Sequence, residues 1–283
     1  MGRVGSWREP AECRCARARE RCGAFDPSPS PTSSSTARSH SCHPSAAHPL
    51  TPRPHGLSSW IGAGAYYHFP DYLLDIDAVV RELAPHERVV LVGHSMGGMA
   101  SGLFAGTFPE RVRGYVSVEG LGPGAMRFDD APDHFAEWIR TNREQLAKQP
   151  RPYATVAEAA TQLRYANPRL AEARSIALAT HGTERGADGL YRWRFDPLHK
   201  SRTPQPFYVD QARAFWRRIT APVLVVIGKA SWVLDVVPDW RERVAAIADT
   251  RVVEIEDAGH MIHHERPDEL ATAIEEFLAT LPG

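Results

Sequence analysis

From residue 55 onward, the hydrophobic positions predict short strands that alternate with amphipathic helices. Runs rich in Val, Leu and Ile predict the strands, and the first run has no polar alternation, as is typical of a buried parallel strand. The predicted strands cover residues 88–92, 115–118, 223–227 and 251–255. Apolar residues spaced three or four positions apart predict helices. The predicted helices cover residues 71–83, 97–107, 238–247 and 267–278. This alternation indicates an α/β fold with a mostly parallel sheet covered by helices.

Residues 123–220 interrupt this rhythm. Their pattern is helical and irregular, and we find no clear strand in it. The helices expected here cover residues 133–146, 155–165, 168–179 and 210–219. An insertion of about a hundred residues between two sheet strands predicts a helical cap.

Residues 1–53 differ in kind from the rest of the chain. They hold eight arginines, no lysine and four acidic residues, and all four cysteines lie within the first 42 positions. Large apolar residues are few and show no period, so this segment cannot bury enough apolar surface to offset the entropy of ordering it. We expect it to be mostly disordered and to add nothing to the fold, with an organelle transit peptide as the alternative. The folded domain is expected to span residues 54–283.

A serine motif joins the predicted strand 88–92 to the helix that follows, with Ser95 between Gly93 and Gly97. A serine hydroxyl is a poor nucleophile until a base removes its proton and donors stabilise the oxyanion. A sharp strand-to-helix turn exposes the Ser95 Oγ and aims the first helix amides at the developing charge. The turn crowds the positions two before and two after the serine, which predicts that both glycines are needed. We therefore predict Ser95 as nucleophile and the Met96 amide as oxyanion donor.

A histidine follows the last predicted strand, in Asp-Ala-Gly-His260. A short loop at the carboxyl end of that strand can bring its ring over the sheet to the serine. His263 and His264 are alternatives, but they fall at the start of the next segment. We predict His260 as the base.

These motifs resemble the α/β-hydrolase superfamily. The resemblance rests on Gly-His-Ser-Met-Gly-Gly at residues 93–98 and Asp-Ala-Gly-His at 257–260, and it covers residues 54–283. The cap segments 191–197 and 214–218 resemble the serine-hydrolase-like, esterase-type branch, and residues 54–58 resemble its Gly-His-Gly-x-Ser loop. The resemblance implies a serine hydrolase that cleaves an ester or similar acyl bond through an acyl-enzyme, without metal or cofactor. A dehalogenase or epoxide hydrolase would carry Asp in place of the serine.

The acid that orients the histidine is where the chain departs from the family. Relatives usually carry Asp or Glu two or three residues after the glycine that ends the strand 223–227, and this chain has Ala230 and Ser231 there. Glu119 ends the strand after the nucleophile helix, a position that resembles the acid of some haloalkane dehalogenases. Asp235 lies on the same loop as the missing acid. We favour Glu119, with Asp235 as the alternative and no competent acid as the remaining possibility.

A second departure lies upstream. This fold normally has a strand ending in His-Gly about 60–70 residues before the nucleophile, and its loop supplies a second oxyanion amide. Residues 25–35 are a Pro/Ser run that cannot form a buried strand, and His55 lies too close to the nucleophile. We therefore expect the N-terminal strands to be missing, through a shifted reading frame, a wrong gene start or a natural variant with a dispensable tail. A degenerate, non-catalytic hydrolase-like protein is the alternative function.

Composition and charge exclude other classes. A length of 283 residues allows one large domain with an insertion. A net charge of −1 favours neither nucleic acid nor an anionic membrane, and no apolar run approaches the roughly 20 residues of a membrane span. We expect a cytoplasmic protein, of undetermined oligomeric state, that acts on a small acyl or ester substrate. Cap aromatics that could line an acyl pocket, or else only fill the cap core, are Trp193, Phe195, Phe207, Tyr208 and Trp216.

Overall fold

The computed structural model describes residues 47–49, 51–53, 55–61, 65–201 and 203–282. Residues 48–283 form one compact unit. The predictions made for residues 1–46 fall outside the described residues, and these include the disorder of that segment, its cysteines and the unsuitability of 25–35 as a strand. The described contacts of the domain begin before residue 54, because the Arg53 guanidinium pairs with the Asp75 carboxylate at 2.9 Å. Arg53 therefore contributes to the fold, contrary to the expectation for residues 1–53.

A four-stranded parallel sheet forms the centre of this unit, in the order β1-β2-β5-β6. Its strands are β1 (Val89–His94), β2 (Val112–Val118), β5 (Val223–Gly228) and β6 (Thr250–Ile255). Every residue of β5 is buried, because β2 and β6 flank it and helices cover both its faces. β1 pairs only with β2 among the described strands, and Val92 is 54% exposed on it. The parallel sheet with packed helices confirms the α/β fold predicted from the sequence.

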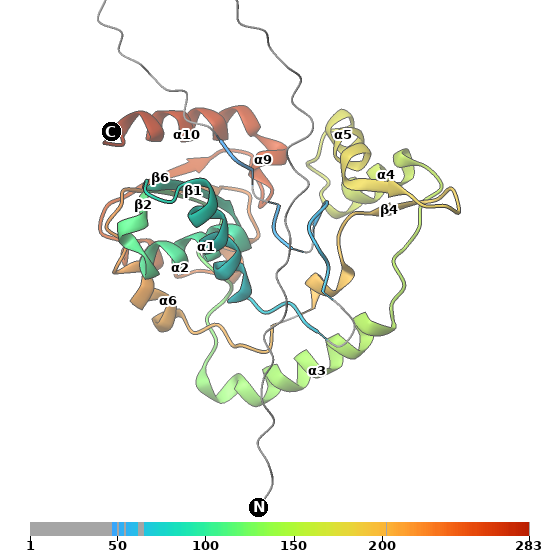
Figure 1. Cartoon of the computed structure of the whole chain (residues 1–283), viewed down its shortest axis with the longest axis horizontal. Coiled ribbons are helices and arrows are strands. Elements are labelled where there is room, and N and C mark those ends of the chain that lie inside the picture. Colours follow the sequence, from blue (N-terminus) through green and yellow to red (C-terminus); the bar gives the residue numbers. More distant parts are fainter. Residues whose placement is uncertain (1–46, 50, 54, 62–64, 202, 283) are drawn as a thin grey trace, which may run out of the picture. The chain divides into compact units, whose positions relative to one another are not determined.

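Helices lie on both faces of the sheet (Figure 1). One face is covered by α9 (Ile262–Glu265) and α10 (Pro267–Thr280). The other face packs against α1 (Asp71–Leu83), α2 (Met96–Thr107), α6 (Val209–Trp216), α7 (Val233–Val236) and α8 (Trp240–Val244). Alternate residues of β5 enter the two cores, with Val225 on the α2 side and Val226 on the α10 side. Because successive side chains of a strand point to opposite faces, β5 contributes apolar side chains to the helical layer on each side of the sheet.

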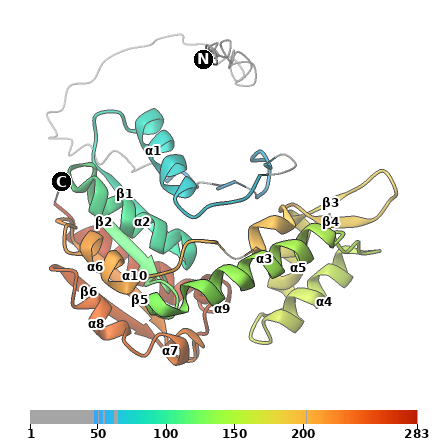
Figure 2. The same cartoon turned by 90° about the horizontal axis from the view of Figure 1, so that it is seen from below.

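The inserted segment forms a cap beside the sheet. Three of its helices are α3 (Ala131–Ala147), α4 (Val156–Ala166) and α5 (Glu172–Gly182), whereas α6 packs into the main core. α3 runs from the sheet toward α5 and α4 (Figure 2). The expectation of no strand in this segment was wrong, because β3 (Thr183–Arg185) and β4 (Tyr191–Trp193) form an antiparallel hairpin. These strands were missed because three residues are too few to show an alternation of apolar and polar side chains. Short 3₁₀ turns lie at Pro109–Arg111, Phe128–Asp130 and Pro197–Lys200.

Candidate active site

Ser95 lies in the turn between β1 and α2, in a backbone conformation that L-residues rarely adopt (φ 51°, ψ −117°). Its N–H donates to the Val118 carbonyl at 2.8 Å, which fixes the turn to the end of β2. A Cβ at Gly93 would overlap the Gly97 backbone, and a Cβ at Gly98 would lie 2.9 Å from the Gly120 Cα. A Cβ at Gly97 would meet nothing within 4 Å, so the expectation that the turn needs glycine there was wrong. The crowding lies on one side of the turn, and Gly97 faces the open side.

The imidazole of His260 lies between a hydroxyl and a carboxylate. Its Nε2 is 3.0 Å from the Ser95 Oγ, and its Nδ1 is 3.1 Å from the Glu119 Oε2. With Nδ1–H donating to the carboxylate, Nε2 carries the lone pair that a general base needs. His263 and His264 lie on α9, where His263 contacts His94 rather than the serine. The structure thus brings together the nucleophile, base and favoured acid named from the sequence.

Glu119 lies at the end of β2 with its side chain fully buried and a left-handed backbone (φ 55°). Its Oε1 accepts from the Gly228 N–H at 2.7 Å, and its Oε2 accepts from the Ser231 hydroxyl at 2.5 Å. With His260 as a third partner, this buried carboxylate has the hydrogen bonds that it needs. Asp235, the alternative acid, is exposed on α7, and the structure does not bring it to the histidine.

Two residues near the histidine were not recognised from the sequence. The sequence shows Ser231 only as a residue that cannot replace the usual acid, but in the structure its hydroxyl donates to the Glu119 carboxylate. Trp232, next to it, is 5.0 Å from the His260 ring, centroid to centroid. Neither role could be found from the sequence. The carboxylate that Ser231 contacts belongs to a different strand, so nothing near Ser231 in the sequence indicates the contact.

The neighbouring histidines are held neutral. Burial lowers the pKa of His94, and burial also lowers the pKa of His263 to about 3, with nearby imidazoles adding to the effect. The His94 Nε2 lies 2.7 Å from the His260 carbonyl oxygen, which can only accept, so this nitrogen carries the proton and donates. The bond holds the loop that carries His260. These neutral rings place no positive charge beside the base.

The Met96 amide occupies the position expected of an oxyanion donor. It is the first residue of α2, and the Met99 N–H makes the first backbone bond back to the Ser95 carbonyl at 2.9 Å. The amides before Met99 have no partner within the helix, as at any helix N-terminus. The Met96 N–H and the helix dipole are therefore available to negative charge next to the Ser95 Oγ.

A cavity of about 610 Å³ opens beside the serine, and its walls come from both the sheet domain and the cap. Phe207 and Tyr208 line it, as expected. Trp193, Phe195 and Trp216 do not line it, so for these three the alternative of filling a core holds. Trp193 and Phe195 stack on each other in the cap, and Trp216 is buried in the main core. Periodicity could not tell which side of a cap element faces the cavity.

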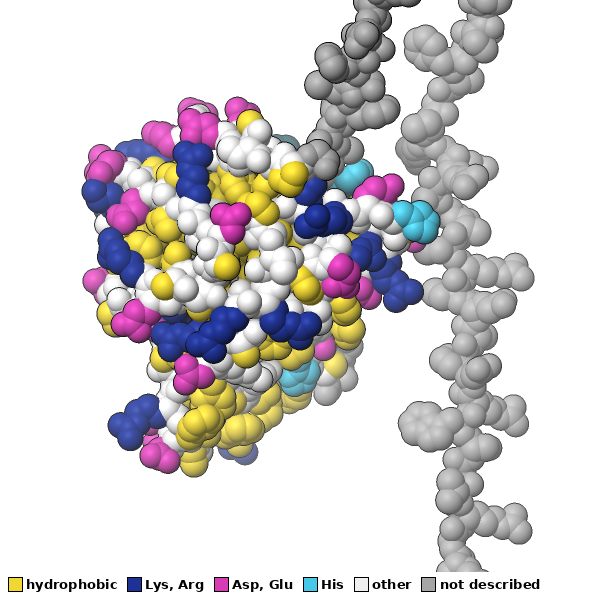
Figure 3. Space-filling model, turned by 90° about the vertical axis from the view of Figure 1, so that its left-hand side faces the viewer, with side chains coloured by type: hydrophobic (Ala, Val, Ile, Leu, Met, Phe, Trp, Pro, Cys, Tyr) yellow, Lys and Arg dark blue, Asp and Glu magenta, His cyan; other side chains and the backbone are white. Residues whose placement is uncertain are grey.

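The described part of the chain offers no site of another kind that its side-chain clusters or helices would support. No cluster of three or more His, Cys, Asp or Glu side chains there could hold a metal ion. None of the helices described is both long and apolar enough to cross a membrane. Basic and acidic side chains are interspersed on the face shown in Figure 3. The cavity beside Ser95 is therefore where we place the candidate chemistry.

The chain is similar to curated hydrolases and to a solved structure. A serine hydrolase-like protein of Danio rerio is 26% identical over 235 residues, which are 79% of this chain and 70% of that protein. The 2-(acetamidomethylene)succinate hydrolase of Mesorhizobium japonicum is 27% identical over 240 residues, 80% of this chain and 76% of that protein. The crystal structure of a hypothetical protein from Pseudomonas aeruginosa PAO1 matches with a TM-score of 0.69 at 28% identity, covering 80% of this chain and 78% of that chain.

A family model confirms the resemblance read from the motifs. The model of the alpha/beta hydrolase family matches residues 30–273, which is more than half of the chain. This match begins at residue 30, whereas the resemblance was expected to begin at residue 54. The relatives named as hydrolases support a hydrolytic role. By sequence and by fold, the chain belongs to the alpha/beta hydrolase family.

Proposed function

We propose that the protein is a serine hydrolase that cleaves an ester or similar acyl bond through an acyl-enzyme intermediate. One observation carries the proposal: the Ser95 hydroxyl, the His260 imidazole and the Glu119 carboxylate form one line of hydrogen bonds, 3.0 and 3.1 Å long. A nucleophile within hydrogen-bond reach of a base, which is itself oriented by a third group, is the arrangement that activates serine.

The first half-reaction forms the acyl-enzyme. The His260 Nε2 takes the proton of the Ser95 hydroxyl as Oγ attacks the substrate carbonyl carbon. The carbonyl π electrons move to oxygen, and the Met96 amide at the start of α2 stabilises this oxyanion. When the intermediate collapses, the bond to the leaving alcohol breaks and His260 gives that alcohol its proton. Glu119 keeps the imidazole oriented and stabilises the imidazolium formed between the two proton transfers.

The second half-reaction releases the acid. A water molecule gives a proton to the same His260 Nε2 and attacks the acyl carbon. Collapse of the second tetrahedral intermediate breaks the bond to the Ser95 Oγ, which recovers its proton from the imidazolium. The buried position of Glu119 suits this cycle, because an ion pair with the imidazolium is stronger in a medium from which water is excluded.

Labelling by a fluorophosphonate tests this proposal directly, because the reagent reacts with activated serines. We expect stoichiometric labelling of the full chain and none of Ser95→Ala, with turnover of a p-nitrophenyl ester reduced by roughly 10⁶-fold in the variant. Ser59→Ala is the matched control, since Ser59 is exposed and lies outside the cavity lining, and it should label like the parent. A chain that is neither labelled nor active would favour the degenerate, non-catalytic alternative. Full labelling of Ser95→Ala would refute the nucleophile assignment.

A further inference from the structure

We propose that the acyl group accepted by this site is uncharged and apolar, and that acyl groups carrying a carboxylate are rejected. This inference rests on the proposed serine hydrolase function and adds the substrate class. It comes from the chemistry of the cavity beside Ser95, whose volume of about 610 Å³ falls within the range of pockets that enclose small molecules.

The walls of the cavity are mostly apolar. Apolar side chains reach it from the start of α1, from α2, from α6 and from α7. Examples from these four elements are Leu73, Met99, Leu103, Phe215, Val233 and Val236. Burying a methylene chain against such walls removes apolar surface from water, which stabilises the bound substrate. The cavity therefore favours an alkyl or aryl acyl group.

The carboxylate and imidazole side chains in the lining are those of the proposed acid and base. They are Glu119 and His260, and no lysine or arginine is among the described residues that line the cavity. The Glu119 carboxylate is already bonded to His260, Ser231 and the Gly228 amide. Among the described lining residues, a substrate carboxylate would find no cation to pair with, and the Glu119 carboxylate would repel it. Its desolvation would be uncompensated.

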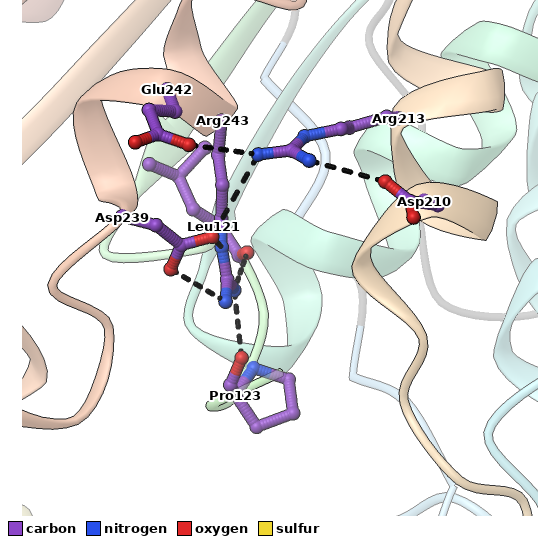
Figure 4. A network of polar contacts seen from close by, with 7 residues as sticks. All are labelled: Leu121, Pro123, Asp210, Arg213, Asp239, Glu242 and Arg243. Atoms are coloured by element: carbon purple, nitrogen blue, oxygen red, sulfur yellow. Dashed lines mark hydrogen bonds and ion pairs between the residues drawn. The ribbon is translucent and has the colours of Figure 1, made fainter. Parts of the chain in front are cut away.

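The cation behind one wall of the cavity is paired with a protein carboxylate and two carbonyls (Figure 4). The Arg243 guanidinium lies 5.4 Å from the ring centre of Phe207, a lining residue, but Arg243 is completely buried and is not part of the lining. Its Nη2 pairs with Asp239 at 2.9 Å, and its Nη1 donates to the carbonyls of Leu121 and Pro123 at 2.9 and 2.7 Å. It holds the wall in place and is not available to a ligand.

A second arginine in the same network is also committed to protein carboxylates. Arg213 on α6 pairs with Asp210 at 3.1 Å and with Glu242 at 3.3 Å, and it lies 3.9 Å from Asp239 (Figure 4). This network joins three carboxylates to two guanidiniums, so it has one negative charge in excess. A network that is already rich in carboxylates gives no attraction to a further anion.

Two esters that differ only at the acyl terminus test the inference on the full chain. p-Nitrophenyl hexanoate ends in a methyl group, and mono-p-nitrophenyl adipate carries a carboxylate in the same place. We expect kcat/KM to be about 100-fold or more higher for the hexanoate, because the carboxylate must be desolvated without a partner. Ser95→Ala gives the background rate for each ester.

The outcomes separate this inference from the proposed function. Equal rates for the two esters, or faster hydrolysis of the adipate, would overturn the inference and leave the serine hydrolase intact. Failure to hydrolyse either ester, together with no fluorophosphonate labelling, would overturn both.

A positive charge introduced at the cavity should reduce the preference for the hexanoate over the adipate. Gln211 lines the cavity from α6 and is exposed, so Gln211→Arg adds a cation there at little cost to folding. We expect the hexanoate-to-adipate ratio to fall about 10-fold. Gln149→Arg makes the same change at an exposed position outside the lining and should leave the ratio unchanged. An unchanged ratio in Gln211→Arg would show that charge is not what the cavity rejects, and it would overturn the inference.

Discussion

The carboxyl ends of β2 and β5 lie side by side in the buried sheet, but only the end of β2 carries a carboxylate. The two strands are parallel neighbours in register, with Val118 beside Val226, and both are largely buried. β2 is followed by Glu119, whereas β5 ends in Gly228 and is followed within three residues by Ser231. Relatives with the usual motif would carry their acid after β5. In this chain, the carboxylate comes from the strand next to it.

The hydrogen bonds explain how this exchange is tolerated. The Gly228 amide and the Ser231 hydroxyl both donate to the Glu119 carboxylate, so the end of β5 supports the acid instead of supplying it. The carboxyl ends of adjacent parallel strands meet at one edge of a sheet, and a side chain from either strand can reach the same point. The proposed reaction needs a carboxylate at the His260 Nδ1, and either strand end could deliver it.

Glu119→Gln should have the largest effect among the variants that probe these two strand ends. The amide preserves shape but cannot stabilise the imidazolium at His260, and the corresponding change in a protease costs about 10⁴-fold in kcat. We expect a loss of that order in kcat for p-nitrophenyl hexanoate. Thermal unfolding of the variant would show that the fold is retained. Turnover close to that of the parent would mean that β2 does not supply the acid.

The acid should also be transferable back to β5. Ser231 reaches to 2.5 Å from the Glu119 Oε2, which is itself 3.1 Å from the His260 Nδ1. In Glu119→Ala the space beside the ring is empty, and Ser231→Asp in that background places a carboxylate at its border. We expect the double variant to be about 10²-fold more active than Glu119→Ala alone. If the two have equal kcat, the strand ends are not interchangeable.

The sheet and the residues that meet at the candidate site could be predicted from the sequence because their signals are local. The run Val89–His94 followed by Ser95 and small residues specifies a strand, a sharp turn and a helix within about 20 positions. The helix predicted over residues 71–83 has those same bounds in the structure. Glu119 could be favoured because its position resembles the acid of some haloalkane dehalogenases and because a carboxylate at the end of a buried strand needs a partner.

The remaining features depend on packing between distant segments. The Ser231 hydroxyl meets a carboxylate 112 residues away, and the Arg243 guanidinium meets carbonyls at Leu121 and Pro123 about as far off. Trp193 was a candidate for the pocket on aromatic character alone, but its ring packs within the cap. Which neighbour a side chain meets is decided by tertiary structure, and no periodicity in one segment records it.

Ser231→Ala should have an intermediate effect, because it removes one donor and leaves the acid. A hydrogen bond to a charged group contributes about 1.5–3 kcal/mol, so a loss of about 10-fold or more in kcat is expected. The hydroxyl acts on the substrate only through Glu119 and His260, so KM for the hexanoate should stay near that of the parent. Ser231→Thr keeps the hydroxyl and should retain more activity than the alanine variant. A rise in KM with unchanged kcat would instead place Ser231 in substrate binding.

Asp235→Asn should have the smallest effect, and it is the matched control for Glu119→Gln because both replace a carboxylate by its amide. Asp235 follows β5 on the short helix α7, as a displaced acid of the usual kind would, but its side chain is exposed. The His260 Nδ1 is already bonded to Glu119, so nothing remains for a second carboxylate to orient. An exposed change of this kind should alter kcat by no more than about twofold. The opposite ranking, with Asp235→Asn inactive and Glu119→Gln active, would assign the acid to the loop after β5. The hydrogen bonds to Glu119 would then be structural, because a buried carboxylate must be paired whether or not it takes part in a reaction.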